Sequence, residues 1–197
     1  MADFKTEIVI DRPVAQVFNF LATNFEANLP KVETNFLYVE QLTEGEVGKG
    51  TLFRAIRAKK DGEQDSSNRD FFKDLDLNTL DPELRSELEE IFLEVTAFEK
   101  DRLFEIVRVG EENKKILENY SFSPENKGTK VFYKINFDSS MVRGDLEKKN
   151  RELGNSKITN FALKLFANPI LKSGVKNGLK TMKAIIEAEL KPGPTNV

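Results

Sequence analysis

Histidine and cysteine are both absent from this sequence of 197 residues. Without cysteine there is no disulfide, no thiolate nucleophile and no cysteine-ligated metal site. Without histidine there is no Ser-His-Asp triad, no histidine general base and almost no route to a zinc site. Any catalysis would therefore have to use Asp, Glu, Lys, Tyr or Arg side chains, and we expect neither a metal ion nor another cofactor.

Long apolar runs are missing as well, so the sequence predicts no membrane-spanning helix. Its first residues, Met1-Ala2-Asp3-Phe4-Lys5, have the features of neither a signal peptide nor a transit peptide, and we expect a cytoplasmic protein. The net charge of −3 gives no general electrostatic reason to expect nucleic-acid binding. With 39% hydrophobic and 32% charged residues, the chain is expected to form one domain over 1–197.

Tryptophan is a third absence, whereas phenylalanine occurs 16 times. The phenylalanines either fill an ordinary core or line an apolar pocket. Composition leaves both interpretations open, and the choice between them depends on the fold.

Seven segments have the composition or the apolar alternation of β-strands. They are residues 4–10, 36–42, 51–58, 92–98, 103–109, 115–123 and 128–138. The last four are joined by short polar connections, which is typical of an antiparallel meander. A helix is predicted after Pro13, which suits a first helical turn.

A long amphipathic helix is predicted over 169–190, with Asn168 as its N-cap and Pro192 beyond its end. Apolar residues recur there at steps of 3 or 4 and form one stripe, composed of Leu171, Val175, Leu179, Met182, Ile186 and Leu190. Four lysines lie off this stripe, at Lys172, Lys176, Lys180 and Lys183. A solvated helix face is the simpler interpretation of these lysines, and a membrane-docking face is the alternative.

Residues 59–90 form a charged insertion with 11 acidic and 5 basic residues. Asp81-Pro82-Glu83 predicts the start of a helix whose thin apolar face would consist of Leu84, Leu88 and Ile91. Asp74, Asp76 and Asn78 have the spacing of a calcium loop. However, Thr79 stands where that loop needs glycine, so we expect no calcium site.

Several short stretches match one known superfamily in order and spacing. They are residues 10–18 (Ile-Asp-Arg-Pro-Val-Ala-Gln-Val-Phe), 48–51 (Gly-Lys-Gly-Thr), 122–124 (Phe-Ser-Pro), 128–129 (Gly-Thr) and Glu187. Together with the order of elements, they make the chain similar to the START-like or helix-grip superfamily, also called SRPBCC, which includes polyketide cyclase/dehydrase-like proteins and pollen-allergen-type lipid binders. The resemblance implies an α+β fold in which a curved antiparallel sheet of about seven strands wraps around the long C-terminal helix.

That resemblance also implies a cavity between sheet and helix that holds a hydrophobic or amphipathic small molecule, such as a lipid, a quinone or a polyketide. The superfamily has no shared catalytic motif. One alternative is a polyketide cyclase or dehydratase, in which Tyr, Arg or Glu would move protons. A second is a protein-interaction module, as in the co-chaperone branch. Transient membrane contact is a further hypothesis, and the sequence leaves the oligomeric state open.

The cavity lining is predicted from the strand faces and the helix stripe. The apolar and aromatic candidates are Phe18, Phe53, Phe104, Tyr120, Phe122, Tyr133, Ile135, Phe137, Val175, Leu179 and Met182. Each of them would serve equally well as plain core.

Four charged residues lie in apolar strands: Arg54, Glu94, Arg108 and Glu118. If they point inward they must be paired, and they could then hold a ligand carboxylate or hydroxyl. Outward positions on a wet strand face are the alternative. Gly178, four residues after Gly174 in the final helix, is a further candidate, because the missing side chain would suit a close strand or a ligand.

Overall fold

The computed structural model describes residues 2–59, 72–73, 75–109, 115–126, 128–137, 173 and 175–191. Its labelled elements, in chain order, are β1 (Ala2–Ile10), α1 (Val14–Phe18), the π-helical turn η1 (Asn19–Thr23), α2 (Phe25–Val32), β2 (Phe36–Gln41), β3 (Leu52–Ala58), the 3-10 turn η2 (Leu77–Thr79), α4 (Pro82–Glu87), β4 (Leu88–Glu99), β5 (Leu103–Val109), β6 (Lys115–Glu125) and β7 (Gly128–Phe137). A C-terminal helix covers 175–189.

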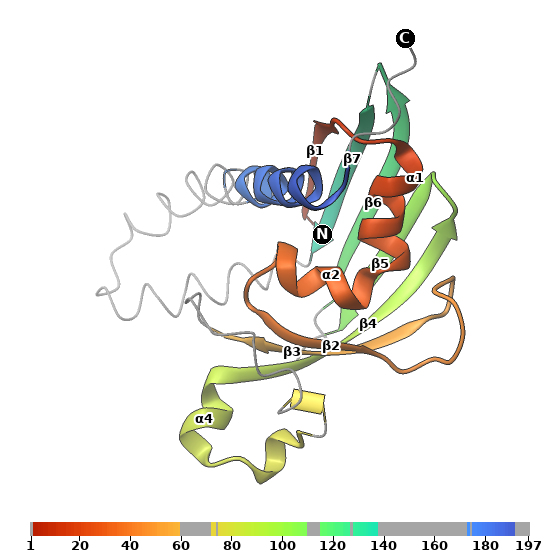
Figure 1. Ribbon diagram of the computed structural model, residues 1–197. Helices are drawn as coiled ribbons and strands as arrows, with labels where there is room; N and C mark the ends of the chain where they lie inside the picture. Colours follow the sequence, from red (N-terminus) through yellow and green to blue (C-terminus); the bar gives the residue numbers. More distant parts are fainter. Residues whose placement is uncertain are drawn as a thin grey trace.

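The seven strands form one antiparallel sheet in the order β1-β7-β6-β5-β4-β3-β2. This confirms the predicted meander, closed at one end by the N-terminal strand and extended at the other by β3 and β2. The sheet is open and curved, and β1 and β2 are its two edges (Figure 1). The C-terminal helix lies by the β1–β7 end of the sheet, on the side that also holds α1 and α2.

The apolar stripe of the C-terminal helix packs into the main core, as its periodicity predicted. Leu179, Met182 and Ile186 are 7%, 2% and 0% exposed and belong to the same buried cluster as the concave face of the sheet. The predicted residues 169–172 and Gly174 lie outside the described residues. Among the described helices, none is both long enough and apolar enough to cross a membrane.

The end of the C-terminal helix is fastened to the join between β1 and α1 by Arg12. The Arg12 side chain is buried, donates from Nε to the Leu190 carbonyl at 2.7 Å, and also donates to the Glu187 carbonyl. In the other direction, the Asp11 N–H donates to the Glu187 carboxylate at 2.7 Å. Free carbonyls at a helix C-terminus need donors of this kind, and a cation suits the helix dipole there. We call these contacts the Arg12 clamp.

The insertion begins a helix where the sequence predicted one, but that helix is shorter than expected. The Asp81 side chain caps α4 by accepting from the Glu83 and Leu84 N–H groups, each at 3.0 Å. The helix ends at Glu87, and β4 starts at Leu88, which pairs with Ala58 of β3. The predicted apolar helix face was therefore wrong for Leu88 and Ile91, because their pairing with β3 places them in the sheet.

A second, smaller core lies on the outer face of the sheet, beneath the insertion. Its buried members come from β2, β3 and β4: Leu37, Tyr38, Ile56, Ala58 and Leu88. Apolar residues of the insertion pack onto them: Phe72, Leu75, Leu77 and Leu80. The insertion therefore covers part of the outer sheet face, away from the C-terminal helix (Figure 1).

Candidate functional site

Most of the predicted lining residues do face the helix side of the sheet, but they pack against one another. Phe18, Phe53 and Phe104 are each 0% exposed. Their rings belong to a chain of aromatic contacts in which Phe18 and Phe122 lie 5.2 Å apart, and Phe25 lies 5.0 Å from Phe53. Such spacings are those of packed aromatic pairs. Within the described residues these phenylalanines pack as a core.

The remaining apolar candidates join the same packing. Tyr133, Leu179 and Met182 are buried, and Tyr120, Ile135 and Val175 are partly buried against the main core. The Phe137 side chain lies outside the described residues.

A buried polar network crosses β5, β6 and β7 on the helix side of the sheet. Arg108 donates to Glu33 at 2.7 Å and forms an ion pair with Glu118, which is only 2% exposed. The hydroxyls of Tyr120 and Tyr133 both donate to Glu118, at 2.9 and 3.0 Å. The structure thus brings together Arg108, Glu118, Tyr120 and Tyr133, as the inward alternative required, and pairs the charges as burial demands.

The pKa values of the groups in this network are shifted so that its hydrogen-bond donors stay protonated. Burial, reinforced by the Glu118 charge, raises the pKa of Tyr120 and of Tyr133 well above the ordinary value, so both hydroxyls remain donors. Burial alone would lower the pKa of Arg108, but the Glu118 and Glu33 charges raise it well above its ordinary value. Burial raises the pKa of Glu33 although Arg108 opposes the shift.

Glu33 gives the folded protein a pH dependence whose sign can be worked out. Since its pKa is raised above the ordinary 4.5, its ionisation costs the folded state more than the unfolded state. Its contribution to stability is complete below pH 4.5 and is lost as the pH rises through the raised value. Glu33→Gln cannot ionise, so its stability relative to the parent should increase from pH 4 to pH 8 in chemical denaturation. A difference that stays constant or falls would contradict this.

The space found beside the network, within the part of the chain that the structure describes, is small. A void of about 20 Å³ lies next to Glu33, Tyr120 and Met182, and the remaining lining comes from η1 and α2. That volume holds roughly one water molecule. In this closed arrangement the network can therefore position a water or a single small polar group.

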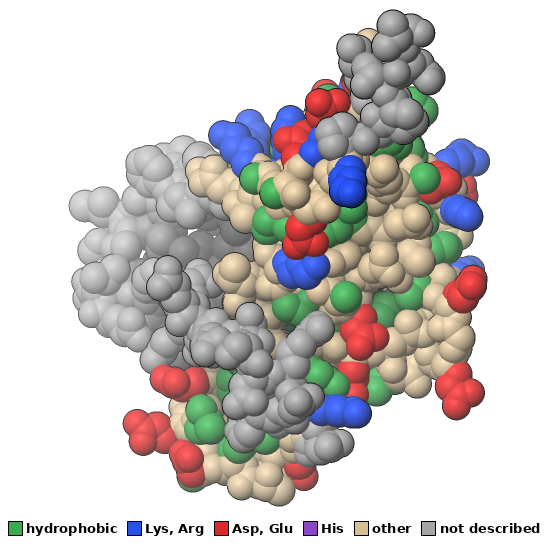
Figure 2. Space-filling model, in the orientation of Figure 1, with side chains coloured by type: hydrophobic (Ala, Val, Ile, Leu, Met, Phe, Trp, Pro, Cys, Tyr) green, Lys and Arg blue, Asp and Glu red, His purple; other side chains and the backbone are tan. Residues whose placement is uncertain are grey.

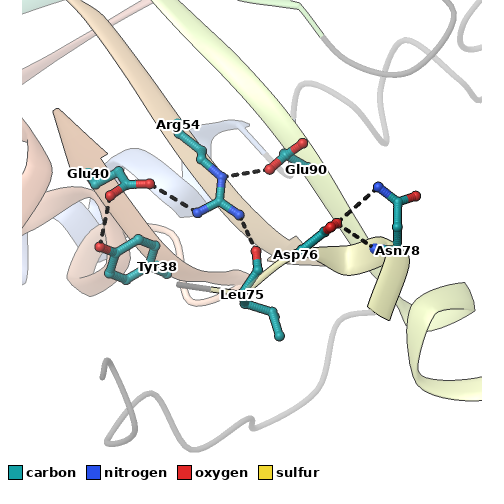
Figure 3. A network of polar contacts seen from close by, with 7 residues as sticks. All are labelled: Tyr38, Glu40, Arg54, Leu75, Asp76, Asn78 and Glu90. Carbon is teal, nitrogen blue, oxygen red and sulfur yellow. Dashed lines mark hydrogen bonds and ion pairs between the residues drawn. The ribbon is translucent and has the colours of Figure 1, made fainter. Parts of the chain in front are cut away.

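Arg54 does not line the interior, which corrects one predicted site residue. It lies on the outer face, where it donates to Glu90 at 2.6 Å, to Glu40 at 3.0 Å and to the Leu75 carbonyl at 2.5 Å (Figure 3). Burial and the nearby Glu40 raise the pKa of Tyr38 to about 12, so its hydroxyl also donates to Glu40. Alternation along β3 explains the outward position, since Phe53 and Ala55 occupy the inner face. Arg54 ties the insertion to the sheet.

Gly178 is the second correction. It is exposed, and an added Cβ would meet no atom of the described structure within 4 Å. The close strand approach proposed from its spacing is thus absent from the described surroundings, whereas room for a ligand beside Gly178 stays a prediction. The helix turns it outward because Leu179 and Met182 occupy the inner stripe.

A hollow in the described structure lies beside the edge strand β1. It has a volume of about 640 Å³ and runs between residues 3–8 of β1 and the C-terminal helix, which contributes Lys176, Leu179 and Lys180. We call it the β1 groove. Strand alternation turns Phe4, Thr6 and Ile8 toward the helix side, and Ile8 packs against the main core. Of the predicted lining residues, Leu179 is the one that this groove includes.

Glu33 and the β1 groove were not predicted from the sequence, and Arg12 was noted only within the stretch 10–18, without its role at the helix end. Glu33 follows α2 in a stretch without periodicity, so nothing in the pattern marks it. For Phe4 and Ile8 a signal was present, because both lie on the predicted inner face of the first strand. Their position at a sheet edge, however, depends on long-range pairing with β7, which places no strand on the other side.

Comparisons with known proteins support the fold. No family model matches the chain, and no curated protein does. Among solved structures, Ara h 8.0201 is similar over 95% of this chain and 98% of its own, with 12% identity and a TM-score of 0.56. The protein TTHA0849 from Thermus thermophilus is similar over 96% of this chain and 100% of its own, with 12% identity and a TM-score of 0.54. Ms6760 from Mycobacterium smegmatis is similar over 95% and 92%, with 13% identity and a TM-score of 0.53.

The chain has the helix-grip fold. The superpositions cover nearly the whole chain, and the seven-stranded sheet with its C-terminal helix agrees with them. At identities of 12–13% the likeness concerns the fold alone. What a helix-grip protein does has to be argued from its own groove and network.

Proposed function

We propose that this protein binds a small apolar or amphipathic molecule in the β1 groove. The observation that carries the proposal is the groove itself, whose volume of about 640 Å³ suits a small organic ligand. Phe4, Ile8 and Leu179 give it apolar walls, and β1 contributes polar backbone groups as an edge strand. Lipids, quinones and polyketides are ligand classes of suitable size and polarity.

Binding is favoured over catalysis because the charged groups and tyrosine hydroxyls of the polar network are already paired with one another. Arg108 and both tyrosine hydroxyls already have acceptors, and the neighbouring void holds about one water. A cyclase or dehydratase would have to bring its substrate to these groups. Turnover of an aromatic polyketide precursor, lost in Glu118→Gln, would favour that alternative.

Thr6→Trp tests the proposal directly, since Thr6 lines the groove and a tryptophan there would narrow it. We expect its affinity for 1-decanol to be at least about tenfold weaker than that of the parent, because the tryptophan side chain fills space in the groove and leaves the ligand less apolar contact area. Isothermal titration calorimetry measures this.

The matched control is Lys134→Trp, which places the same side chain on the opposite face of the neighbouring strand β7. It should bind 1-decanol as the parent does. If 1-decanol binds equally to both variants, ligand binding in the β1 groove is refuted.

A further inference from the structure

In the part of the chain that the structure describes, the arginines of the interior are already paired and are not available to an anionic ligand. Arg108 is shared between Glu33 and Glu118, so this buried network holds one positive and two negative formal charges. Arg57 is paired with Glu89 at 2.6 Å. An anion placed beside the network would meet a net negative charge in a poorly solvated site, which is costly.

Arg12 is equally occupied. Its guanidinium donates hydrogen bonds to the backbone carbonyls of Leu190, Glu187 and Asp11. A ligand that took one of these donors would leave a helix carbonyl without its partner. The groove itself has the apolar side chains of Phe4, Ile8 and Leu179 in its lining, and these suit an apolar group.

The rim of the groove has the opposite character. Lys176 and Lys180 lie one helical turn apart, line the groove on either side of Leu179 in sequence, and are exposed. Neither has an ion pair or a hydrogen bond with the described residues, whereas Lys183, on the next turn, donates to the Val9 carbonyl at 2.7 Å. Figure 2 shows basic and acidic side chains close together at several places on the face that it presents.

Two carboxylates also line the groove, but their negative charges do not neutralise the positive charges of Lys176 and Lys180. Asp3 is paired with Lys5 at 3.4 Å. Glu7 lies on the opposite face of β1 from Phe4 and Ile8, by strand alternation, and its charge acts on Lys130 of β7. Three cations and two carboxylates leave the groove with one positive formal charge.

Resting on the proposed function, we infer that the β1 groove selects amphiphiles with an anionic head group. The head group lies between Lys176 and Lys180, and the chain lies along Phe4, Ile8 and Leu179. The ligand class is thus a single-chain organic anion, such as a long-chain carboxylate. The lysines act as specificity-determining residues for a site whose affinity comes from apolar contact.

Three probes with the same chain and different head groups test this: decanoate, 1-decanol and decylamine, titrated calorimetrically at pH 8 and low salt. The parent should bind decanoate about three- to tenfold tighter than 1-decanol, since each exposed ion pair contributes modestly. Lys176→Gln/Lys180→Gln should abolish that preference, so that decanoate and 1-decanol bind this variant with equal affinity. The control pair Lys49→Gln/Lys100→Gln, at exposed turn positions, should keep it.

The outcomes separate this inference from the proposed function. Equal binding of decanoate and 1-decanol, or a preference for decylamine, overturns the anionic selection and leaves groove binding standing. Failure of all three probes refutes groove binding itself. If the double variant loses co-sedimentation with phosphatidylglycerol vesicles but keeps its decanoate preference, the lysines serve a membrane surface and the inference is wrong. High salt should weaken the preference of the parent.

Discussion

Glu118→Gln is expected to lower the free energy of unfolding by about 3–5 kcal/mol, the usual cost of breaking a buried ion pair on one side. The parent carboxylate is 2% exposed and accepts from two tyrosine hydroxyls while pairing with Arg108. Glutamine would leave the guanidinium with one carboxylate and would turn an amide N–H₂ toward groups that need an acceptor. Urea denaturation at pH 7 measures the loss.

The matched control for Glu118 is Glu99→Gln. Glu99 is also paired with an arginine, Arg102, but their side chains are 53% and 78% exposed. We expect a change within about 0.5 kcal/mol there. A loss below about 1 kcal/mol for Glu118→Gln would mean that solvent reaches the network, and would contradict the closed interior described above.

Arg12→Ala is the second large effect, expected to cost about 2–4 kcal/mol, because hydrogen bonds from a charged donor are worth about 1.5–3 kcal/mol each. It would leave the carbonyls of Glu187 and Leu190 without the donors that fasten the helix end. Amide hydrogens near the end of the C-terminal helix should therefore exchange faster than those of β5 and β6. Hydrogen exchange followed by NMR separates this local opening from global unfolding.

Arg12→Lys provides the conservative comparison. It keeps a cation near the helix C-terminus but lacks the planar fork that reaches two carbonyls at once, so we expect it to recover part of the loss. Arg102→Ala, on an exposed turn, should change little. If Arg12→Ala exchanges like the parent over 182–190, then the apolar stripe alone holds the helix.

Most of the fold could be predicted from local pattern, because the same residues that alternate in sequence also alternate between a buried and a wet face. Val131 and Tyr133 on the inner face of β7, and Leu179 and Ile186 on the helix, are examples. The extent of β4 could not be predicted. Leu88 and Ile91 fit a helical stripe and a strand face equally, and pairing with β3, far away in sequence, decided between them.

The candidate site was harder to predict for the same reason. A charged residue in an apolar strand points inward or outward according to its parity and its partners, and the partners are remote in sequence. Arg108 turned inward because Glu33 and Glu118 meet it there, whereas Arg54 turned outward to Glu40, Glu90 and the insertion. The aromatic residues carried even less information, since a packed core and a lined cavity need the same composition.

The absence of tryptophan makes the central claim directly measurable. Phe4→Trp would place one fluorophore on the groove wall, and Lys134→Trp would place one on the other face of the sheet. Titration with 11-bromo-1-undecanol, whose bromine quenches tryptophan only at near contact, should quench Phe4→Trp with saturation and leave Lys134→Trp unchanged. Equal quenching of both variants, or no saturable quenching of Phe4→Trp, would contradict a ligand site in the β1 groove.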